Sequence, residues 1–176
     1  NPHSIEEYAE AACSALVSEF DKVDMPLPDL WLEPGRYIAG NAGVLLTTIE
    51  SIKTEEGHRW YYADASTNIM PLLGAAIEGT HNHILAATRM HEPIALKADI
   101  VGPLCIPSVL RADCPLPDLG SGDLIVILDA GMYAESDSHQ LNWIPRPATV
   151  MVNNDEVGLV RATETLDSIF ATQRLP

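Results

Sequence analysis

Residues 32–46 read LEPGRYIAGNAGVLL, and this stretch says more about the fold than any other part of the chain. We expect a short strand at 29–32 that runs directly into Glu33-Pro34-Gly35-Arg36. Proline fixes φ and glycine allows conformations closed to other residues, so the tetrapeptide predicts a tight turn with Glu33 and Arg36 side by side. One interpretation is a surface ion pair. The other is a site in which the carboxylate holds the proton of a pyridine nitrogen and the guanidinium binds a phosphate.

Two further segments place a reactive side chain next to a residue that shapes the backbone. In Gly102-Pro103-Leu104-Cys105 the thiol is expected on a loop, where it can donate a proton; the alternative is a buried, inert cysteine, the interpretation given to Cys13 and Cys114. In Asp129-Ala130-Gly131-Met132-Tyr133 a phenol follows an apolar strand. It is expected to reach a phosphate or a bound aldehyde, or else to cover the core with its hydroxyl in water.

The composition excludes several classes of protein. A net charge of -15 with only 10 Lys and Arg argues against nucleic acid and anionic membranes as partners. At 47% hydrophobic residues the chain is expected to fold, and the sequence has no apolar run near the roughly 20 residues of a membrane span. Three irregularly spaced cysteines suggest no disulfide framework, so we expect an acidic cytoplasmic protein.

The pattern of residues predicts two regions. Residues 4–23 read as a helix capped by Ser4, and together with the strand at 29–32 they suggest that 1–35 is the tail of an α/β barrel. Residues 36–176 read as a mainly β domain, a barrel or sandwich, closed by a helix at 163–171. Its strands are expected within 37–52 and at 59–63, 95–101, 124–130 and 148–152, and its turns at 56–57, 115–122 and 153–154.

Histidines suggest a metal site only weakly. His81 and His83 alternate on what is expected to be a strand, but no third ligand is evident. We therefore expect no metal.

In order and spacing, the three motifs resemble the C-terminal part of the fold-type III pyridoxal-phosphate decarboxylases, the group of diaminopimelate and ornithine decarboxylase. The resemblance implies pyridoxal 5′-phosphate as cofactor. It implies that Glu33 pairs with the pyridine nitrogen and that Gly35 and Arg36 bind near the cofactor phosphate or the substrate carboxylate. It also implies that Cys105 donates a proton to the substrate carbon and that Tyr133 contacts the cofactor. In such enzymes the cysteine reaches across a homodimer interface, so two chains build each site.

The chain departs from the family at positions that bind the distal end of the substrate. Diaminopimelate decarboxylases carry Arg-Pro-x-x-Tyr where this chain has Met70-Pro71-Leu72-Leu73-Gly74, and Cys-Glu-Ser where it has Cys105-Ile106-Pro107. Ornithine-type enzymes have an acidic residue after the cysteine. An unpaired buried charge is costly, so we expect a substrate whose distal end is uncharged or tethered, for example to a carrier protein. The expected substrate contacts are Arg36, Met70, Gly74, Ile106 and Tyr133.

The family's Schiff-base lysine has no counterpart, because Lys22, Lys53 and Lys97 lie in other contexts. The chain starts at Asn1, without Met, which suggests a truncated or processed protein. We expect it to act only with a pyridoxal-phosphate-binding barrel, upstream or on a separate chain, and to be inactive alone. Two alternatives are a non-catalytic binding module that keeps the decarboxylase fold and a racemase, although the cysteine and tyrosine motifs favour the decarboxylase.

Overall fold

The structure is a computed structural model that describes residues 3–71, 82–106 and 108–174. The chain forms two compact units, Asn1–Pro34 and Gly35–Pro176. Assignment of residues 1–35 to a cofactor-binding barrel stays a prediction.

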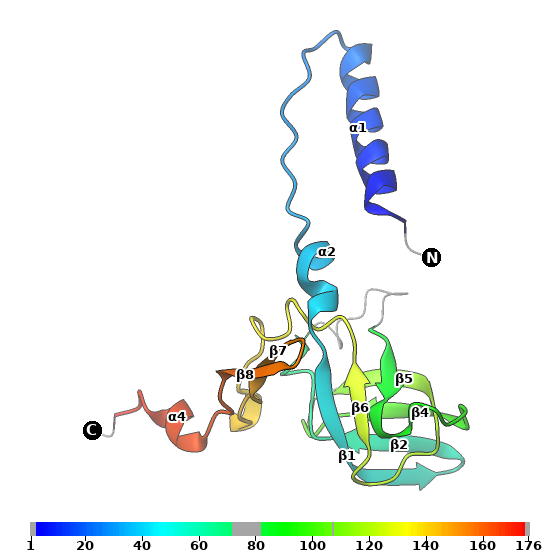
Figure 1. The fold of residues 1–176 in the computed structure, drawn as a ribbon, viewed down its shortest axis with the longest axis vertical. Coiled ribbons are helices and arrows are strands. Elements are labelled where there is room, and N and C mark those ends of the chain that lie inside the picture. The colour runs from blue at the N-terminus through cyan, green and yellow to red at the C-terminus, as the bar shows by residue number, and fades with distance from the viewer. Residues whose placement is uncertain (1–2, 72–81, 107, 175–176) are drawn as a thin grey trace. The chain divides into compact units, whose positions relative to one another are not determined.

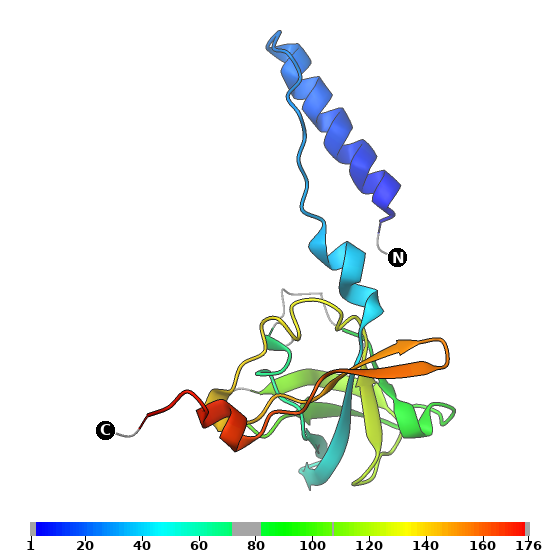
Figure 2. The ribbon, with the colours of Figure 1, turned by 60° about the vertical axis from the view of Figure 1, so that its left-hand side comes forward.

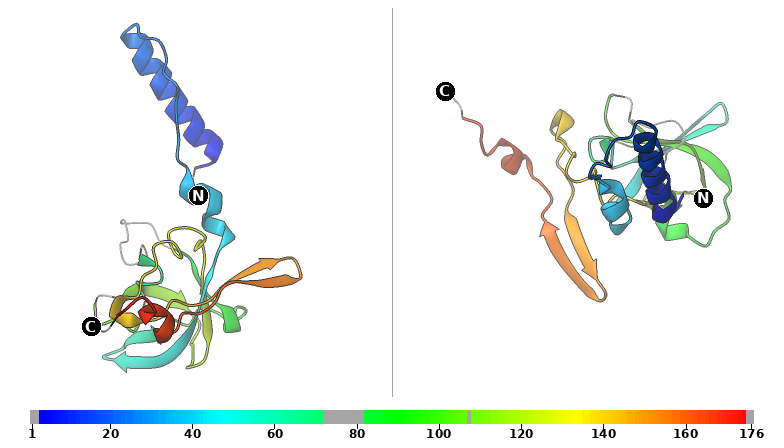
Figure 3. Two further views of the ribbon diagram at one scale, coloured as in Figure 1. Left: turned by 90° about the vertical axis from the view of Figure 1, so that its left-hand side faces the viewer. Right: turned by 90° about the horizontal axis from the view of Figure 1, so that it is seen from above.

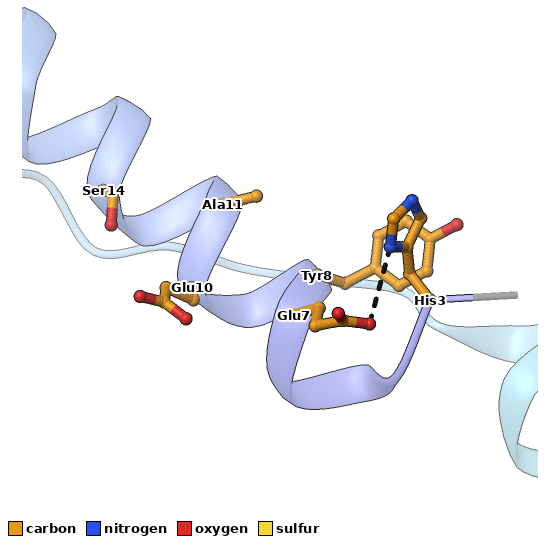
Figure 4. A pocket seen from close by; sticks show the side chains of 6 residues that line it. All are labelled: His3, Glu7, Tyr8, Glu10, Ala11 and Ser14. Carbon is orange, nitrogen blue, oxygen red and sulfur yellow. Dashed lines mark ion pairs between the residues drawn. The ribbon is translucent and has the colours of Figure 1, made fainter.

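The first unit contains one long helix, α1 (Ile5–Lys22), which confirms the helix predicted at 4–23. Its start is fixed by a capping box: Glu7 donates its backbone N–H to Ser4 Oγ at 3.2 Å, and Ser4 donates its own to Glu7 Oε2 at 2.7 Å. The same Glu7 oxygen lies 3.5 Å from His3 Nδ1, as Figure 4 shows. The hollow drawn there is lined only by α1 and the residue before its cap, so it is an open helix face. Cys13 is exposed on α1, and the expectation of a buried thiol there was wrong.

Two local predictions before residue 40 were also wrong. Residues 29–32 form no strand: none of the described strands pairs with them, and all four residues are exposed. Instead of closing a tight turn, Gly35 begins a short helix, α2 (Gly35–Ala39). Proline is well tolerated at the start of a helix, where its missing N–H has no acceptor to lose, so Pro34 leads into α2. A 3-10 turn, η1 (Gly40–Ala42), follows.

The second unit is built on a six-stranded sheet in the order β3-β6-β1-β2-β4-β5 (Figure 1). All pairs are antiparallel except β2 with β4. The edge strands β3 and β5 approach each other, so the sheet nearly closes into a barrel, and the mainly β fold class is confirmed. The strands are β1 (Leu45–Glu55), β2 (His58–Ala63), β3 (Ile84–Ala86), β4 (Leu96–Val101), β5 (Val109–Leu116) and β6 (Leu124–Ile127). The sequence did not predict β3 or β5.

The interior of this sheet is filled by side chains from alternating strand positions. The largest fully buried ones are Tyr61, Ile49, Ile100, Leu116, Ile125 and Ile127. Burying each aliphatic side chain stabilises the fold by about 1.5–3 kcal/mol. The Tyr61 hydroxyl accepts a hydrogen bond from the Leu119 N–H at 3.1 Å, so the phenol is buried without an orphaned polar group.

A separate hairpin pairs β7 (Thr149–Asn153) with β8 (Glu156–Arg161) and projects from the sheet, as Figures 2 and 3 show. The predicted strand at 148–152 corresponds to β7, whereas β8 was missed. The expected closing helix at 163–171 is shorter, α4 (Leu166–Phe170), and begins at the cap Thr165.

None of the helices that the structure describes combines the length and the apolar character needed to cross a membrane. The described residues also contain no group of three metal-ligating side chains. Of the two histidines considered, His81 lies outside the described residues. His83 precedes β3, and its backbone carbonyl accepts the Leu128 N–H at 2.9 Å.

Candidate active site

Residues 35–43 and 129–133, far apart in the sequence, meet through their backbones. Ala130 donates its N–H to the Gly43 carbonyl at 2.8 Å, and Gly131 donates to the Gly40 carbonyl at 2.9 Å. A Cβ added at Gly131 would lie 1.9 Å from the Ala39 carbonyl oxygen, so only glycine fits. Two of the three sequence motifs thus belong to one structural feature.

This contact brings Arg36 and Tyr133 together. The guanidinium carbon of Arg36 lies 5.8 Å from the centre of the Tyr133 ring, within the range of a cation–π contact. A Cβ added at Gly35 would lie 3.5 Å from the Tyr133 hydroxyl oxygen, an ordinary contact distance, so Gly35 lies beside the phenol. Tyr133 is 47% exposed, and Arg36 has no acidic partner among the residues that the structure describes. A cation and a hydroxyl donor are therefore both available to an anion.

The third motif forms a loop closed at its base. The Gly102 N–H donates to both the carbonyl and the hydroxyl oxygen of Ser108, each at 2.9 Å. A Cβ at Gly102 would lie 2.5 Å from the side chain of Ser66. Within the loop, Leu104 is buried and Cys105 is exposed, as the proton-donor interpretation requires. Cys114 is buried in the core, which confirms the predicted burial, and burial raises the pKa of its thiol to about 11.

Sequence reasoning missed one neighbour of Cys105. Asn142 points its side-chain Nδ2 at the sulfur, at 3.5 Å. It belongs to the 3-10 turn η3 (Leu141–Trp143). No sequence motif marked this turn, because the contact depends on tertiary folding.

Three of the remaining predicted residues, Glu33, Met70 and Ile106, lie in the part of the chain that the structure describes. Glu33 is exposed in the first unit, and Gly74 lies outside the described residues. Met70 is 6% exposed and packs in the core, which leaves little of it to contact a substrate. Ile106, beside the cysteine, is 45% exposed and is available for such a contact.

Residues 18–131 match the family described as "Pyridoxal-dependent decarboxylase, C-terminal sheet domain". The chain belongs to this family. A diaminopimelate decarboxylase of Methanothermobacter thermautotrophicus is 36% identical over 99% of this chain, and that of Bacillus subtilis is 35% identical over 93%. The crystal structure of diaminopimelate decarboxylase from M. jannaschii matches with a TM-score of 0.76 and 28% identity over 96% of this chain.

The chain spans about two fifths of the length of these curated relatives, 40% of the Methanothermobacter protein and 37% of the Bacillus protein. It likewise covers 38% of the M. jannaschii chain.

Proposed function

We propose that this chain is part of a pyridoxal-phosphate-dependent enzyme that decarboxylates an amino acid or an amino-acid derivative. The observation that carries the proposal is the meeting of Arg36 and Tyr133, from two motifs, within a domain of the decarboxylase family. The chain would act together with a pyridoxal-phosphate-binding barrel, and as a homodimer in which each site draws residues from both copies.

The residues present fit the cofactor. The phosphate would accept hydrogen bonds from the Arg36 guanidinium and the Tyr133 hydroxyl, which lie on the same side of the 35–43 and 129–133 contact. Glu33, three residues before Arg36, would hold the proton of the pyridine nitrogen. When bound, the protonated pyridine ring draws away the electron pair that loss of CO2 leaves on the substrate α-carbon.

Cys105 would then deliver a proton to that carbon. Its exposed position on a loop tied down at Gly102 and Ser108 suits a group that must reach a site formed with a second copy. The proton leaves the thiol as a new C–H bond forms, and the sulfur becomes a thiolate that water reprotonates.

For the substrate, we infer a distal end that is uncharged or tethered, for example to a carrier protein. The residue after the cysteine is Ile106, exposed and apolar, where a carboxylate would be needed to pair with a free ammonium group. Met70 lies in the core and offers no charge to a distal carboxylate. The relatives named diaminopimelate decarboxylases favour the opposite choice, a free diamino acid.

The test measures CO2 release by the full-length protein with pyridoxal phosphate. The substrates are meso-diaminopimelate, lysine, ornithine, and glutamate both free and as a carrier-protein thioester. Cys105→Ala should lower kcat about 10²- to 10⁴-fold, the range for loss of a general acid. Cys13→Ala removes the other exposed thiol and should leave kcat unchanged.

Arg36→Gln should weaken cofactor binding about tenfold or more, since it removes a charge-assisted bond to phosphate. No CO2 release from any amino acid, with the cofactor still bound, would favour the non-catalytic binding module. Release from free meso-diaminopimelate alone would overturn the inference about the distal end.

A further inference from the structure

The amide of Asn142 is the group that the structure aims at the sulfur of Cys105, with Nδ2 3.5 Å from Sγ. Both side chains are exposed, so water could satisfy the Asn142 amide, and the contact with sulfur does not serve to satisfy a buried polar group. A hydrogen bond to sulfur has a longer reach than one to oxygen, and an N–H donor stabilises a thiolate more than a thiol. The contact is therefore suited to a cysteine that gives up a proton.

The segment that carries Asn142 is held on both sides by a single carboxylate. Glu164 accepts hydrogen bonds from Gln140 Nε2, from the Arg146 backbone N–H and from Arg146 Nε, each at 2.9 Å. The Glu164 N–H in turn donates to the Arg146 carbonyl at 3.0 Å. Residues 140 and 146 are thus fixed to the same group, and Asn142 lies between them.

Aromatic packing adds a further constraint. The ring of Trp143, next to Asn142, lies 4.7 Å from that of Phe170 in α4, and Figure 2 shows α4 beside this part of the chain. Before the turn, His139 donates its N–H to the Asn68 carbonyl at 3.0 Å, while Asn68 Nδ2 donates to the His139 carbonyl at 3.1 Å. The position of the Asn142 backbone is therefore determined from three directions.

We propose that Asn142 is a positioning residue for Cys105, which orients the thiol and stabilises the thiolate left after the proton has been donated. This role rests on the proposed function of Cys105 as proton donor. The residues of the C-terminal segment, Glu164 and Phe170, would support it by holding the turn on which Asn142 lies.

An alternative explanation of Asn142 lies in its backbone. Its φ is 57°, in the left-handed region that asparagine tolerates better than most residues. Glycine also adopts this conformation freely but has no amide side chain, so Asn142→Gly separates the two explanations. The hairpin turn provides a matched control: Asn154 has φ 53° and no described contact with Cys105, so Asn154→Gly makes the same chemical change elsewhere.

The experiment is alkylation by iodoacetamide of the full-length protein without added cofactor, at a fixed pH, followed by mass spectrometry of the peptides. The rate at Cys105 is divided by the rate at Cys13, which is exposed in the same molecule. Asn142→Gly should lower this ratio about three- to tenfold, the range for loss of one hydrogen bond to a charged group over a long contact. Asn154→Gly should leave it unchanged. Asn142→Asp keeps the shape but places a negative charge beside the sulfur, so it should lower the ratio at least as far.

An unchanged ratio in Asn142→Gly would overturn the proposal, as would an equal fall in Asn154→Gly. If Asn142→Gly fails to fold, Asn142→Asp decides: a ratio equal to that of the unmodified protein would also overturn it. The readout needs no catalytic turnover. A protein that releases no CO2 but shows the predicted ratios would refute the proposed function and leave the Asn142–Cys105 pairing standing.

Discussion

Gly131→Ala tests whether the backbone contact between 35–43 and 129–133 holds the candidate site together. The added methyl would lie 1.9 Å from the Ala39 carbonyl oxygen, 2.9 Å from the Gly43 nitrogen and 3.0 Å from the Ala39 carbonyl carbon. All three are backbone atoms, so no rotation of a side chain relieves the clash. The two segments must move apart by about 1 Å or more before the methyl reaches ordinary contact distance.

That movement determines the expected loss of stability. It stretches the hydrogen bonds from Gly131 N–H to the Gly40 carbonyl and from Ala130 N–H to the Gly43 carbonyl, now 2.9 and 2.8 Å. Each contributes about 0.5–1.5 kcal/mol when made, and more is lost if a buried group is left without a partner. With residual strain in the backbone, we expect a loss of about 2–4 kcal/mol in the free energy of unfolding.

Urea unfolding followed by circular dichroism measures this change. The control is Gly158→Ala in β8, where an added methyl meets nothing within 4 Å, and the expected change is within about 0.5 kcal/mol. Cofactor affinity gives a second readout, since separating the segments also separates Arg36 from Tyr133. If Gly131→Ala were as stable as the unmodified protein, or Gly158→Ala equally damaged, the backbone contact would not have the role assigned to it.

Two further predictions concern titratable groups away from this contact. Hydrogen bonds from Arg146 lower the pKa of Glu164 from 4.5 to about 2, so its contribution, about 2 kcal/mol after screening, is present above pH 4.5 and lost as the pH falls toward 2. Glu164→Gln should therefore destabilise the protein at pH 6 and make little difference near pH 2, and a pH-independent difference in unfolding free energy would contradict this. Because burial raises the pKa of Cys114 to about 11, native protein at pH 8 should leave Cys114 unmodified by iodoacetamide while Cys13 reacts, and urea should abolish the difference.

Elements fixed by local chemistry were predictable from the sequence. The helix α1 begins at the predicted cap because Ser4 and Glu7 satisfy each other's backbone donors whatever surrounds them. The turn at Glu56-Gly57, which joins β1 to β2, was predictable because glycine adopts positive φ freely; φ is 83° at Gly57 and 50° at Glu56.

Elements that depend on distant partners were not predictable. Pro115 was taken for the start of a turn, yet it lies in β5, paired with Lys97 of β4. A proline is tolerated there because β5 is an edge strand, where the missing N–H leaves no neighbour unbonded. The prediction of a strand at 29–32 was wrong for the opposite reason. The composition suits a strand, but no described strand pairs with these residues.

The candidate site was likewise predictable only in part. The three motifs were visible because each combines a reactive side chain with a glycine or proline, but the sequence could not show that two of them touch. The contact itself explains their composition: a Cβ at Gly43 would lie 2.7 Å from the Gly131 Cα and a Cβ at Gly131 would lie 1.9 Å from the Ala39 carbonyl oxygen, so the close approach of the two backbones requires both glycines. Because backbone meets backbone, the spacing does not depend on any rotamer. The backbones that carry Arg36 and Tyr133 are therefore held close together without help from any side chain, as the proposed phosphate site would require.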